Sequence, residues 1–324
     1  MARLPDFIII GAAKCGTTTL YKKLANHPRV FMSTPKEPEF FARDDIYEKG
    51  LDWYANLFAS ATDSQLCGEA STLYTLTTLF PHTVSRMHNT VPQAKLIYVL
   101  REPVNRAYSF YTQLVKNYQN CTRNFNVNRT FDECLFPDLY PNRCSRVQFF
   151  APFDKHLPDD PRTLLDGSRY MTQINNYLCA FDRSQLLLLD FKELVENPDK
   201  VMVDVCEFLN LDISEMRTTE EVRENISSEH FQYADAEITR QGLVSKVKSN
   251  PIGRKLIQMT PMAIKKRLLD CYTLLFKKTN NLSRPAKMSP RAEGYLHEIF
   301  KDEIIGLEDF WKRDLSSWQQ KNRN

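Results

Sequence analysis

The sequence predicts an α/β fold, a single domain in which helices flank a mostly parallel central sheet. Three observations lead to this prediction. Short apolar runs at 7–10, 94–100 and 186–189 are typical of strands that are covered on both faces. Stretches with helical periodicity separate these runs, as crossovers between parallel strands require. The first run also ends in a glycine-bounded loop that leads into a helix and is typical of a phosphate cradle.

The composition is sufficient for one large domain. The chain has 324 residues, of which 42% are apolar, so it can bury a full core. Nine glycines and the lack of a low-complexity tract leave no obvious linker, and we expect one domain from 5 to 318. The 43 basic residues nearly balance the 40 acidic ones, which argues against general binding to nucleic acid or to a membrane surface. Any anion site must therefore be local.

The elements between the first two apolar runs are short. Pro35 and Pro38 restrict the residues that precede them, so 34–41 is interpreted as a loop. The remaining elements are a helix, a second helix and a short strand, expected at about 17–26, 51–58 and 65–68.

The second half of the chain continues the alternation of strands and helices. The strand 94–100 ends at Arg101, and Pro103 is suited to open a helix that runs to about Val115. The polar stretch 116–160 shows no sustained periodicity and is interpreted as an irregular insertion that contains cysteines. The later elements are a helix, a strand, an amphipathic helix and a last helix, expected at about 168–180, 186–189, 198–209 and 290–310.

The first loop has the spacing of a phosphate-binding loop but not its usual lysine. Gly11 and Gly16 stand in a G-x-x-x-x-G pattern, which lets backbone N–H groups converge on an anion in front of a helix. A nucleoside-triphosphate loop has Lys at the next position, where this chain has Thr17, and the lysine of this loop is Lys14. This displacement favours a phosphorylated donor other than ATP.

Other polar groups are expected near the same loop. Ligands of parallel α/β sheets bind beyond the carboxyl ends of the strands. Arg101 follows one predicted strand directly and Asp190 follows another, so both should lie at the edge that holds Lys14.

Two segments give the chain a family resemblance. They are similar to the 5′-phosphosulfate-binding and 3′-phosphate-binding motifs of the PAPS-dependent sulfotransferases, in the expected order, and lie at 11–18 and 100–109. Further segments resemble the Golgi glycan branch of that family, which includes heparan sulfate N- and 3-O-sulfotransferases, and lie at 36–41, 50–54 and 68–74. The insertion with Cys134 and Cys144 most resembles the chondroitin N-acetylgalactosamine-4-sulfate 6-O-sulfotransferase.

The resemblance implies the donor, PAPS (3′-phosphoadenosine 5′-phosphosulfate), and the residues that bind it. Lys14 would stabilise the charge that grows on the leaving phosphate. Arg101 would bind the 3′-phosphate, since its guanidinium can bond two oxygens at once. The expected donor-binding residues are Lys14, Cys15, Gly16, Thr17, Thr18, Thr19, Arg101 and Ser109, with Arg284 and Lys287 as candidates for the loop that closes over the nucleotide.

Glu69 is the candidate general base, because its small flanking residues would let an acceptor approach and would raise its pKa. Lys36 is a further catalytic candidate that would bond the sulfonate or orient Glu69. Alternatives remain for each: Glu69 as a structural carboxylate, Lys36 as a solvated lysine, and Arg101 as a partner of Glu102.

Two other function classes are compatible with parts of the sequence. The run 186–190 is typical of a Walker-B strand, in which Asp190 would hold Mg²⁺ for a kinase or another P-loop NTPase. The displaced Lys14 argues against that function and would leave Arg101 without a role. A nucleotide-binding module without catalysis would keep Lys14 and Arg101 but would not need Glu69. The histidines show no ligand spacing, so we expect no metal.

The acceptor and the cellular address are less constrained. The resemblance implies a carbohydrate such as a glycosaminoglycan, with a small-molecule alcohol as the alternative, and arginines in the insertion favour an anionic glycan. We expect no membrane segment in the chain as given, since no apolar run approaches ~20 residues. Eight cysteines and four N-x-[ST] sequons favour the Golgi lumen over the cytoplasm, with a disulfide between Cys134 and Cys144. The oligomeric state is left open.

Overall fold

The computed structural model describes residues 3–120, 130–139, 163–216 and 285–319. These residues belong to two units. The first unit contains the sheet, and its described residues are 3–110, 163–216 and 288–319. The second unit includes 111–120 and 130–139 among its described residues.

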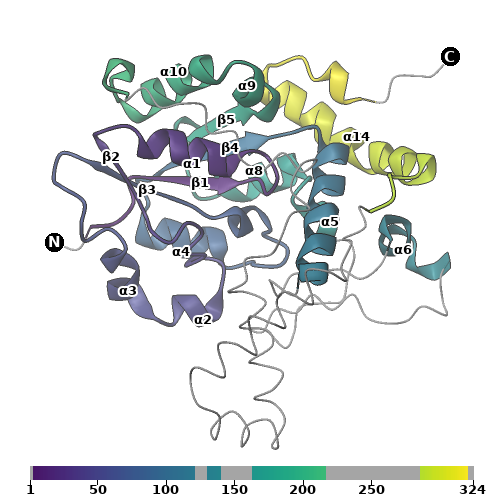
Figure 1. Ribbon diagram of the computed structural model, residues 1–324, viewed down its shortest axis with the longest axis horizontal. Coiled ribbons are helices and arrows are strands. Elements are labelled where there is room, and N and C mark those ends of the chain that lie inside the picture. The colour runs from purple at the N-terminus through teal and green to yellow at the C-terminus, as the bar shows by residue number, and fades with distance from the viewer. Residues whose placement is uncertain (1–2, 121–129, 140–162, 217–284, 320–324) are drawn as a thin grey trace, which may run out of the picture. The chain divides into compact units, whose positions relative to one another are not determined.

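The first unit is built on a five-stranded sheet in which every neighbouring pair of strands is parallel (Figure 1). The strands lie in the order β2-β3-β1-β4-β5. Their bounds are Phe7–Gly11 for β1, Val30–Met32 for β2, Leu66–Ala70 for β3, Lys95–Leu100 for β4 and Leu186–Asp190 for β5. The predicted α/β class with a parallel central sheet is confirmed.

The central strand β1 is apolar because both of its faces are covered. All five of its residues are buried, as an inner strand of a parallel sheet requires. On its neighbour β3, Gly68 makes room for the ring of Phe7, which a Cβ at that position would meet at 2.1 Å. In register, Ile8 lies between Glu69 of β3 and Leu96 of β4. Glu69 is thus in the body of the sheet.

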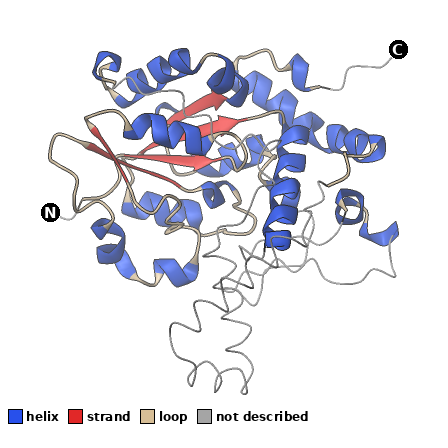
Figure 2. Ribbon diagram, viewed as in Figure 1, coloured by secondary structure: helices blue, strands red, loops and turns tan. Residues whose placement is uncertain are grey.

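Helices lie on both sides of the sheet (Figure 2). Six helices, namely α1, α3, α5, α8, α10 and α14, agree with the predicted ones to within about five residues, whereas α4 was not predicted. The bounds are Thr17–Ala25 for α1, Asp44–Tyr47 for α2, Gly50–Asn56 for α3, Thr83–Thr90 for α4, Pro103–Asn120 for α5, Thr163–Asp166 for α7, Tyr170–Leu178 for α8, Phe191–Glu196 for α9, Pro198–Leu209 for α10 and Pro290–Trp311 for α14.

The beginning of the predicted insertion is more regular than expected. Helix α5 continues to Asn120, and α6 (Phe131–Leu135) follows with a capping box between Thr130 and Glu133. The rings of Tyr111 and Phe131 lie 4.9 Å apart, so the part of α5 that belongs to the second unit packs against α6. Short capped helices lack the long periodicity that reveals a helix in a sequence.

The rest of the insertion lies outside the described residues, including Cys144, although Cys134 is buried in α6. The predicted disulfide therefore stays a prediction. The polar segment expected at 218–255 also lies outside them.

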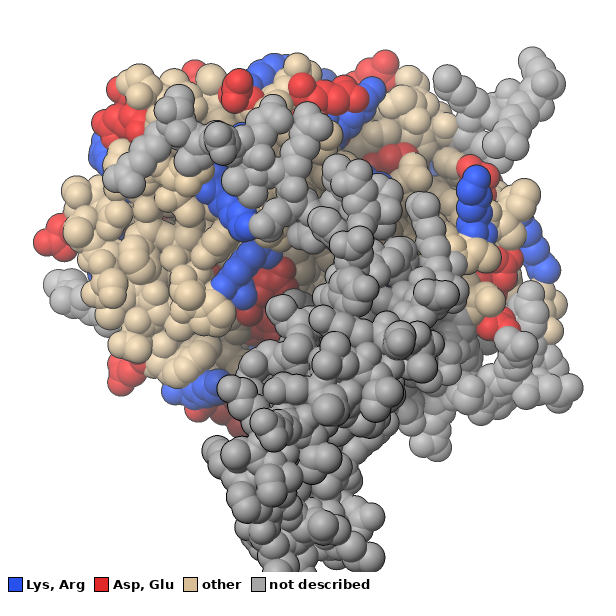
Figure 3. All heavy atoms as spheres, viewed as in Figure 1, with Lys and Arg blue, Asp and Glu red and all other residues tan. Residues whose placement is uncertain are grey.

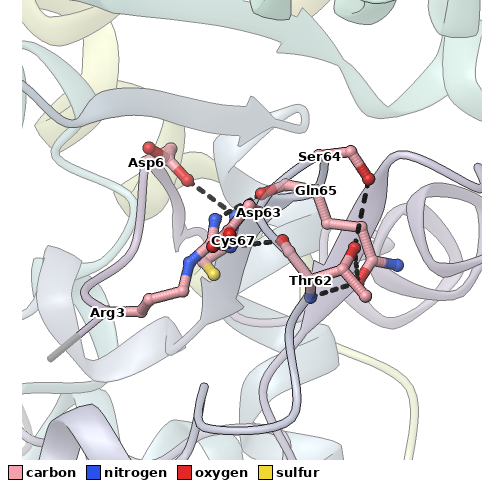
Figure 4. Close-up of polar contacts among 7 residues, drawn as sticks. All are labelled: Arg3, Asp6, Thr62, Asp63, Ser64, Gln65 and Cys67. Carbon is pink, nitrogen blue, oxygen red and sulfur yellow. Dashed lines mark hydrogen bonds and ion pairs between the residues drawn. The ribbon is translucent and has the colours of Figure 1, made fainter. Parts of the chain in front are cut away.

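The N-terminal segment is tied to the start of β3 (Figure 4). Arg3 donates hydrogen bonds to the backbone carbonyls of Thr62 and Gln65. Asp6 accepts a hydrogen bond from the N–H of Cys67 at 2.7 Å and donates its own N–H to the Cys67 carbonyl. These contacts set the register in which β1 enters the sheet.

On the part of the face in Figure 3 where described residues are visible, basic and acidic side chains lie near one another in small mixed groups, and a broad area is uncharged. This agrees with the near balance of charges in the sequence. Within the part of the chain that the structure describes, no helix combines the length and the apolar character needed to cross a membrane.

Candidate functional site

The loop between β1 and α1 turns sharply and approaches α9 closely. Lys14 and Gly16 both have left-handed backbone conformations, with φ of 72° and 79°. The Ala12 N–H donates to the Val99 carbonyl of β4 at 2.9 Å, which fixes the start of the loop. A Cβ at Gly16 would lie 3.1 Å from both Phe191 and Leu194 of α9. Gly16 is therefore needed for its conformation and for the space that it leaves.

The start of α1 is available to an anion. Its first turn contains no acidic residue, and no side chain caps its N–H groups. Thr17 is buried, whereas Thr18, Thr19 and Lys14 are half-buried around the same turn. Backbone N–H groups at such a helix start, together with the helix dipole, bind phosphate well.

Cys15 faces the interior rather than this helix start. Its side chain is fully buried, and its N–H donates to the Ala12 carbonyl within the loop at 3.2 Å. Burial raises the pKa of the Cys15 thiol to about 11, against smaller opposing effects of Arg106 and Arg101. The thiol is thus neutral at physiological pH, and its position indicates a packing role beneath the loop.

Arg101 connects the two predicted phosphate-binding motifs. Its Nη1 donates a hydrogen bond to the Lys14 carbonyl at 3.2 Å, and its guanidinium lies over the Phe191 ring, 4.8 Å from the centroid. Its backbone is held by Tyr170, whose hydroxyl donates to the Arg101 carbonyl at 2.7 Å. Glu102 is not the partner of the Arg101 guanidinium. Its carboxylate accepts hydrogen bonds from the N–H groups of Val104 and Asn105 and so caps α5.

Ser109 lies two turns into α5 and has an unsatisfied hydroxyl. Its side chain is buried, and its Oγ has no hydrogen-bond partner among the residues that the structure describes. Buried polar atoms without a partner are rare in folded proteins. An anionic ligand oxygen would satisfy this hydroxyl.

Glu69 is buried more deeply than the sequence suggests. Its exposed fraction is 0%, and neither carboxylate oxygen makes a hydrogen bond of normal geometry within the described ranges. Burial raises the pKa of Glu69 from its ordinary value of 4.5 to about 8. The hydroxyls of Tyr74 and Tyr54 lower this pKa by a smaller amount, and the charge of Glu39 raises it. A fully buried carboxyl cannot touch an acceptor in this conformation.

Lys36 contacts Glu37 and not Glu69. Its Nζ lies 2.6 Å from Oε1 of Glu37, and the two side chains are 19% and 23% exposed. The Glu37 N–H donates to the carbonyl of Ala70, the last residue of β3, at 2.9 Å. Glu37 is therefore an accessible carboxylate at the carboxyl end of β3. The sequence alone did not identify it as a candidate. The sequence signal that could have identified Glu37 is its position between Lys36 and Pro38, in the segment 36–41 that resembles the glycan branch.

Asp190 is occupied by structural partners. One oxygen accepts from the Lys192 N–H at 2.7 Å and so caps α9, while the other forms an ion pair with Arg313 at 2.9 Å. Glu193 pairs with the same guanidinium at 2.9 Å. An Asp190 held in this way is poorly suited to bind Mg²⁺, which weakens the kinase alternative.

The structure does not test the two candidates for the closing loop. Arg284 lies outside the described residues. Lys287 is exposed just before α14 and belongs to the second unit. The role of both residues in the closing loop stays a prediction from the sequence.

Known proteins resemble this chain in sequence. The bifunctional heparan sulfate N-deacetylase/N-sulfotransferase 1 of Mus musculus is 32% identical over 215 residues, which are 64% of this chain and 22% of that protein. The heparan sulfate glucosamine 3-O-sulfotransferase 5 of Mus musculus is 29% identical over 210 residues, which are 64% of this chain and 54% of that protein. The chain thus spans about a fifth to a half of the length of these relatives.

A solved structure agrees in fold. A sulfotransferase from Alicyclobacillus acidocaldarius superposes with a TM-score of 0.62 at 23% identity, covering 98% of this chain and 100% of that one. A model of the sulfotransferase domain matches residues 4–248, a range that includes the loop at Lys14, Arg101 and all five strands of the sheet. Since this match covers well over half of the chain, the protein belongs to the sulfotransferase domain family.

Proposed function

We propose that this protein transfers a sulfuryl group from PAPS to a hydroxyl or amine of a carbohydrate. The observation that supports this most is the 3.2 Å hydrogen bond from Arg101 to the Lys14 carbonyl, which joins the two segments that we propose to bind anions. PAPS carries two separate anionic groups on its ribose, a phosphate at the 3′ position and a phosphosulfate at the 5′ position. A donor of that kind needs two adjacent anion sites, whereas a nucleoside triphosphate needs one continuous cradle.

The residues on each side suit one end of PAPS. The 5′-phosphosulfate would bind to the N–H groups and hydroxyls of Thr17, Thr18 and Thr19 at the start of α1. The 3′-phosphate would bind to Arg101 and to the unsatisfied hydroxyl of Ser109. No metal ion is needed for this binding, because the positive charges come from the chain.

The transfer step requires a charge stabiliser and a base. The acceptor oxygen or nitrogen attacks sulfur, the bond from sulfur to the bridging oxygen breaks, and the phosphate departs as 3′-phosphoadenosine 5′-phosphate (PAP). The ammonium of Lys14 would stabilise the negative charge on the departing phosphate. A carboxylate would take the proton that the acceptor loses.

Two carboxylates compete for the role of base. Glu69 is favoured by the sequence, and a pKa of about 8 is near the operating pH, as suits a general base. Its complete burial favours Glu37 instead, since Glu37 is accessible and paired with Lys36. Either residue lies by the carboxyl end of β3, and variants of each distinguish them.

The acceptor is proposed from the relatives. Two of them are named for heparan sulfate, which supports a glycosaminoglycan acceptor for this chain. The eight cysteines and four N-x-[ST] sequons of the sequence support an address in the Golgi lumen. The alternatives are a small-molecule alcohol and the cytoplasm.

The test is incubation of the purified protein with labelled PAPS and a panel of desulfated glycosaminoglycans, phenols and sterols, with and without EDTA. We expect label in a glycosaminoglycan and no effect of EDTA. The absence of transfer to every acceptor, or an ATP hydrolysis that needs Mg²⁺, contradicts the proposal. Binding of PAP without any transfer would favour a nucleotide-binding module.

A further inference from the structure

The segment that follows α14 contacts the beginning of α9 through Arg313. The guanidinium of Arg313 bridges two carboxylates, with Nη2 at 2.9 Å from Oδ2 of Asp190 and Nη1 at 2.9 Å from Oε2 of Glu193. Asp190 is almost fully buried, and its second oxygen caps α9 through the Lys192 N–H. Charge-assisted bonds from a planar guanidinium constrain the orientation of their partners. Arg313 therefore constrains the orientation of Asp190, the residue that caps α9.

The first residue of α9 is in contact with Arg101. The ring of Phe191 lies beneath the Arg101 guanidinium, 4.8 Å from its centroid, in a cation–π arrangement. Phe191 follows Asp190 directly in the chain, so a change in the position of Asp190 is passed to this ring. The guanidinium that would bind the 3′-phosphate thus rests on a ring whose position depends on Arg313.

The same C-terminal segment also supports the backbone of Arg101. Trp318 is buried, and its ring lies 6.3 Å from that of Tyr170. The hydroxyl of Tyr170 donates to the Arg101 carbonyl at 2.7 Å. Both residues that hold Arg101, Phe191 and Tyr170, are therefore supported by the segment 313–318.

We infer that Arg313 is a positioning residue for the donor: it holds α9 in place, so that Phe191 orients the Arg101 guanidinium toward the 3′-phosphate. This inference rests on the proposed function, in which Arg101 binds PAPS. Arg313 lies beyond the residues 4–248 that match the family model, and its role follows from contacts made by the folded chain.

The experiment measures the affinity of the full chain for PAP by calorimetry. In R313M the Kd for PAP should rise about five- to tenfold, because Arg101 loses its preferred orientation. R313K should have an intermediate Kd, since a single ammonium cannot bridge two carboxylates as a planar fork does. The control is K312Q, at the position next to Arg313. It breaks an exposed ion pair between Lys312 and Asp309 and should leave the Kd for PAP within about twofold of wild type.

A double-mutant cycle separates positioning from general destabilisation. Because Arg313 acts through Arg101, the R313M exchange should change the Kd for PAP by less than about twofold in an R101M background. A purely structural role would weaken binding by the same factor in both backgrounds, and that result overturns the inference. If R313M does not fold, E193Q removes one of the two ion pairs and replaces it in the cycle, with the same two outcomes.

Binding of PAP to the wild-type protein separates a failure of the proposed function from a failure of the role of Arg313. If it fails to bind PAP, the proposed function is contradicted. If it binds PAP and R313M binds equally well, only the role of Arg313 is contradicted.

Discussion

The guanidinium of Arg101 donates a hydrogen bond to the backbone carbonyl of Lys14 across 3.2 Å. The two residues follow neighbouring parallel strands, β4 and β1, so the sheet brings their loops to the same edge. One hydrogen bond thus links the two segments proposed to bind the two ends of PAPS.

Replacing Arg101 by Met should weaken donor binding. Loss of a charge-assisted contact costs about 1.5–3 kcal/mol, which corresponds to a KM for PAPS that is roughly ten- to a hundredfold higher. The measurement is KM from initial rates at varied PAPS. The matched control is R183M, which removes a guanidinium that stacks on Phe310 and bonds Leu186 at the opposite end of β5. Equal KM values for both variants would contradict the role of Arg101.

Replacing Lys14 by Met should affect the transfer step more than donor binding. Removal of one group that stabilises transition-state charge lowers kcat by about 10²–10³-fold. The Kd for PAP should change far less, because the helix start still holds the 5′-phosphate. Rapid-quench measurements give the rate of the transfer step, and calorimetry gives the Kd for PAP. The control is K23M, in the last turn of α1. A loss confined to PAP affinity would show that Lys14 only binds.

The variants E69Q and E37Q should identify the base. Loss of a general base lowers kcat by about 10²–10⁴-fold while the affinity for PAP is retained. We expect this pattern in one of the two variants, and the exposed E48Q serves as control. A collapse of PAP affinity together with kcat would assign a structural role to the residue concerned. Full activity in both variants would exclude both as the base.

The stability of the protein should decrease as the pH rises from about 4.5 to about 8 because of Glu69. Burial raises the pKa of Glu69 from 4.5 to about 8, so in this window the folded state holds a proton that the unfolded state has lost. Because the folded state binds more protons than the unfolded state in this window, raising the pH lowers the free energy of unfolding. Urea unfolding at several pH values should show this slope in wild type and a flatter one in E69Q. Parallel slopes would mean that Glu69 titrates normally.

Mass mapping of unreduced peptides should join Cys134 to Cys144. A disulfide of this kind forms in an oxidising compartment, which is one basis of the proposed lumenal address. Detection of both residues as thiols in secreted material would contradict the disulfide and remove this argument.

The sequence predicts the α/β class because the relevant signals are local. The apolar run at 7–10 and the helix that follows depend on neighbours a few residues away, and both are confirmed. Short elements such as β2 and α9 escape this kind of reasoning, since three to six residues carry too little periodicity.

The sequence by itself determined the donor-site candidates: the loop with its displaced Lys14, and Arg101 at the end of a strand. Only the tertiary structure decided how accessible the candidate base is and what Asp190 contacts. Glu69 is buried near Tyr54 and Tyr74, which come from separate segments, and Asp190 meets Arg313, 123 residues away. Backbone propensity acts over a few residues, whereas burial, pKa and ion pairing depend on which distant segments the sheet and helices bring together.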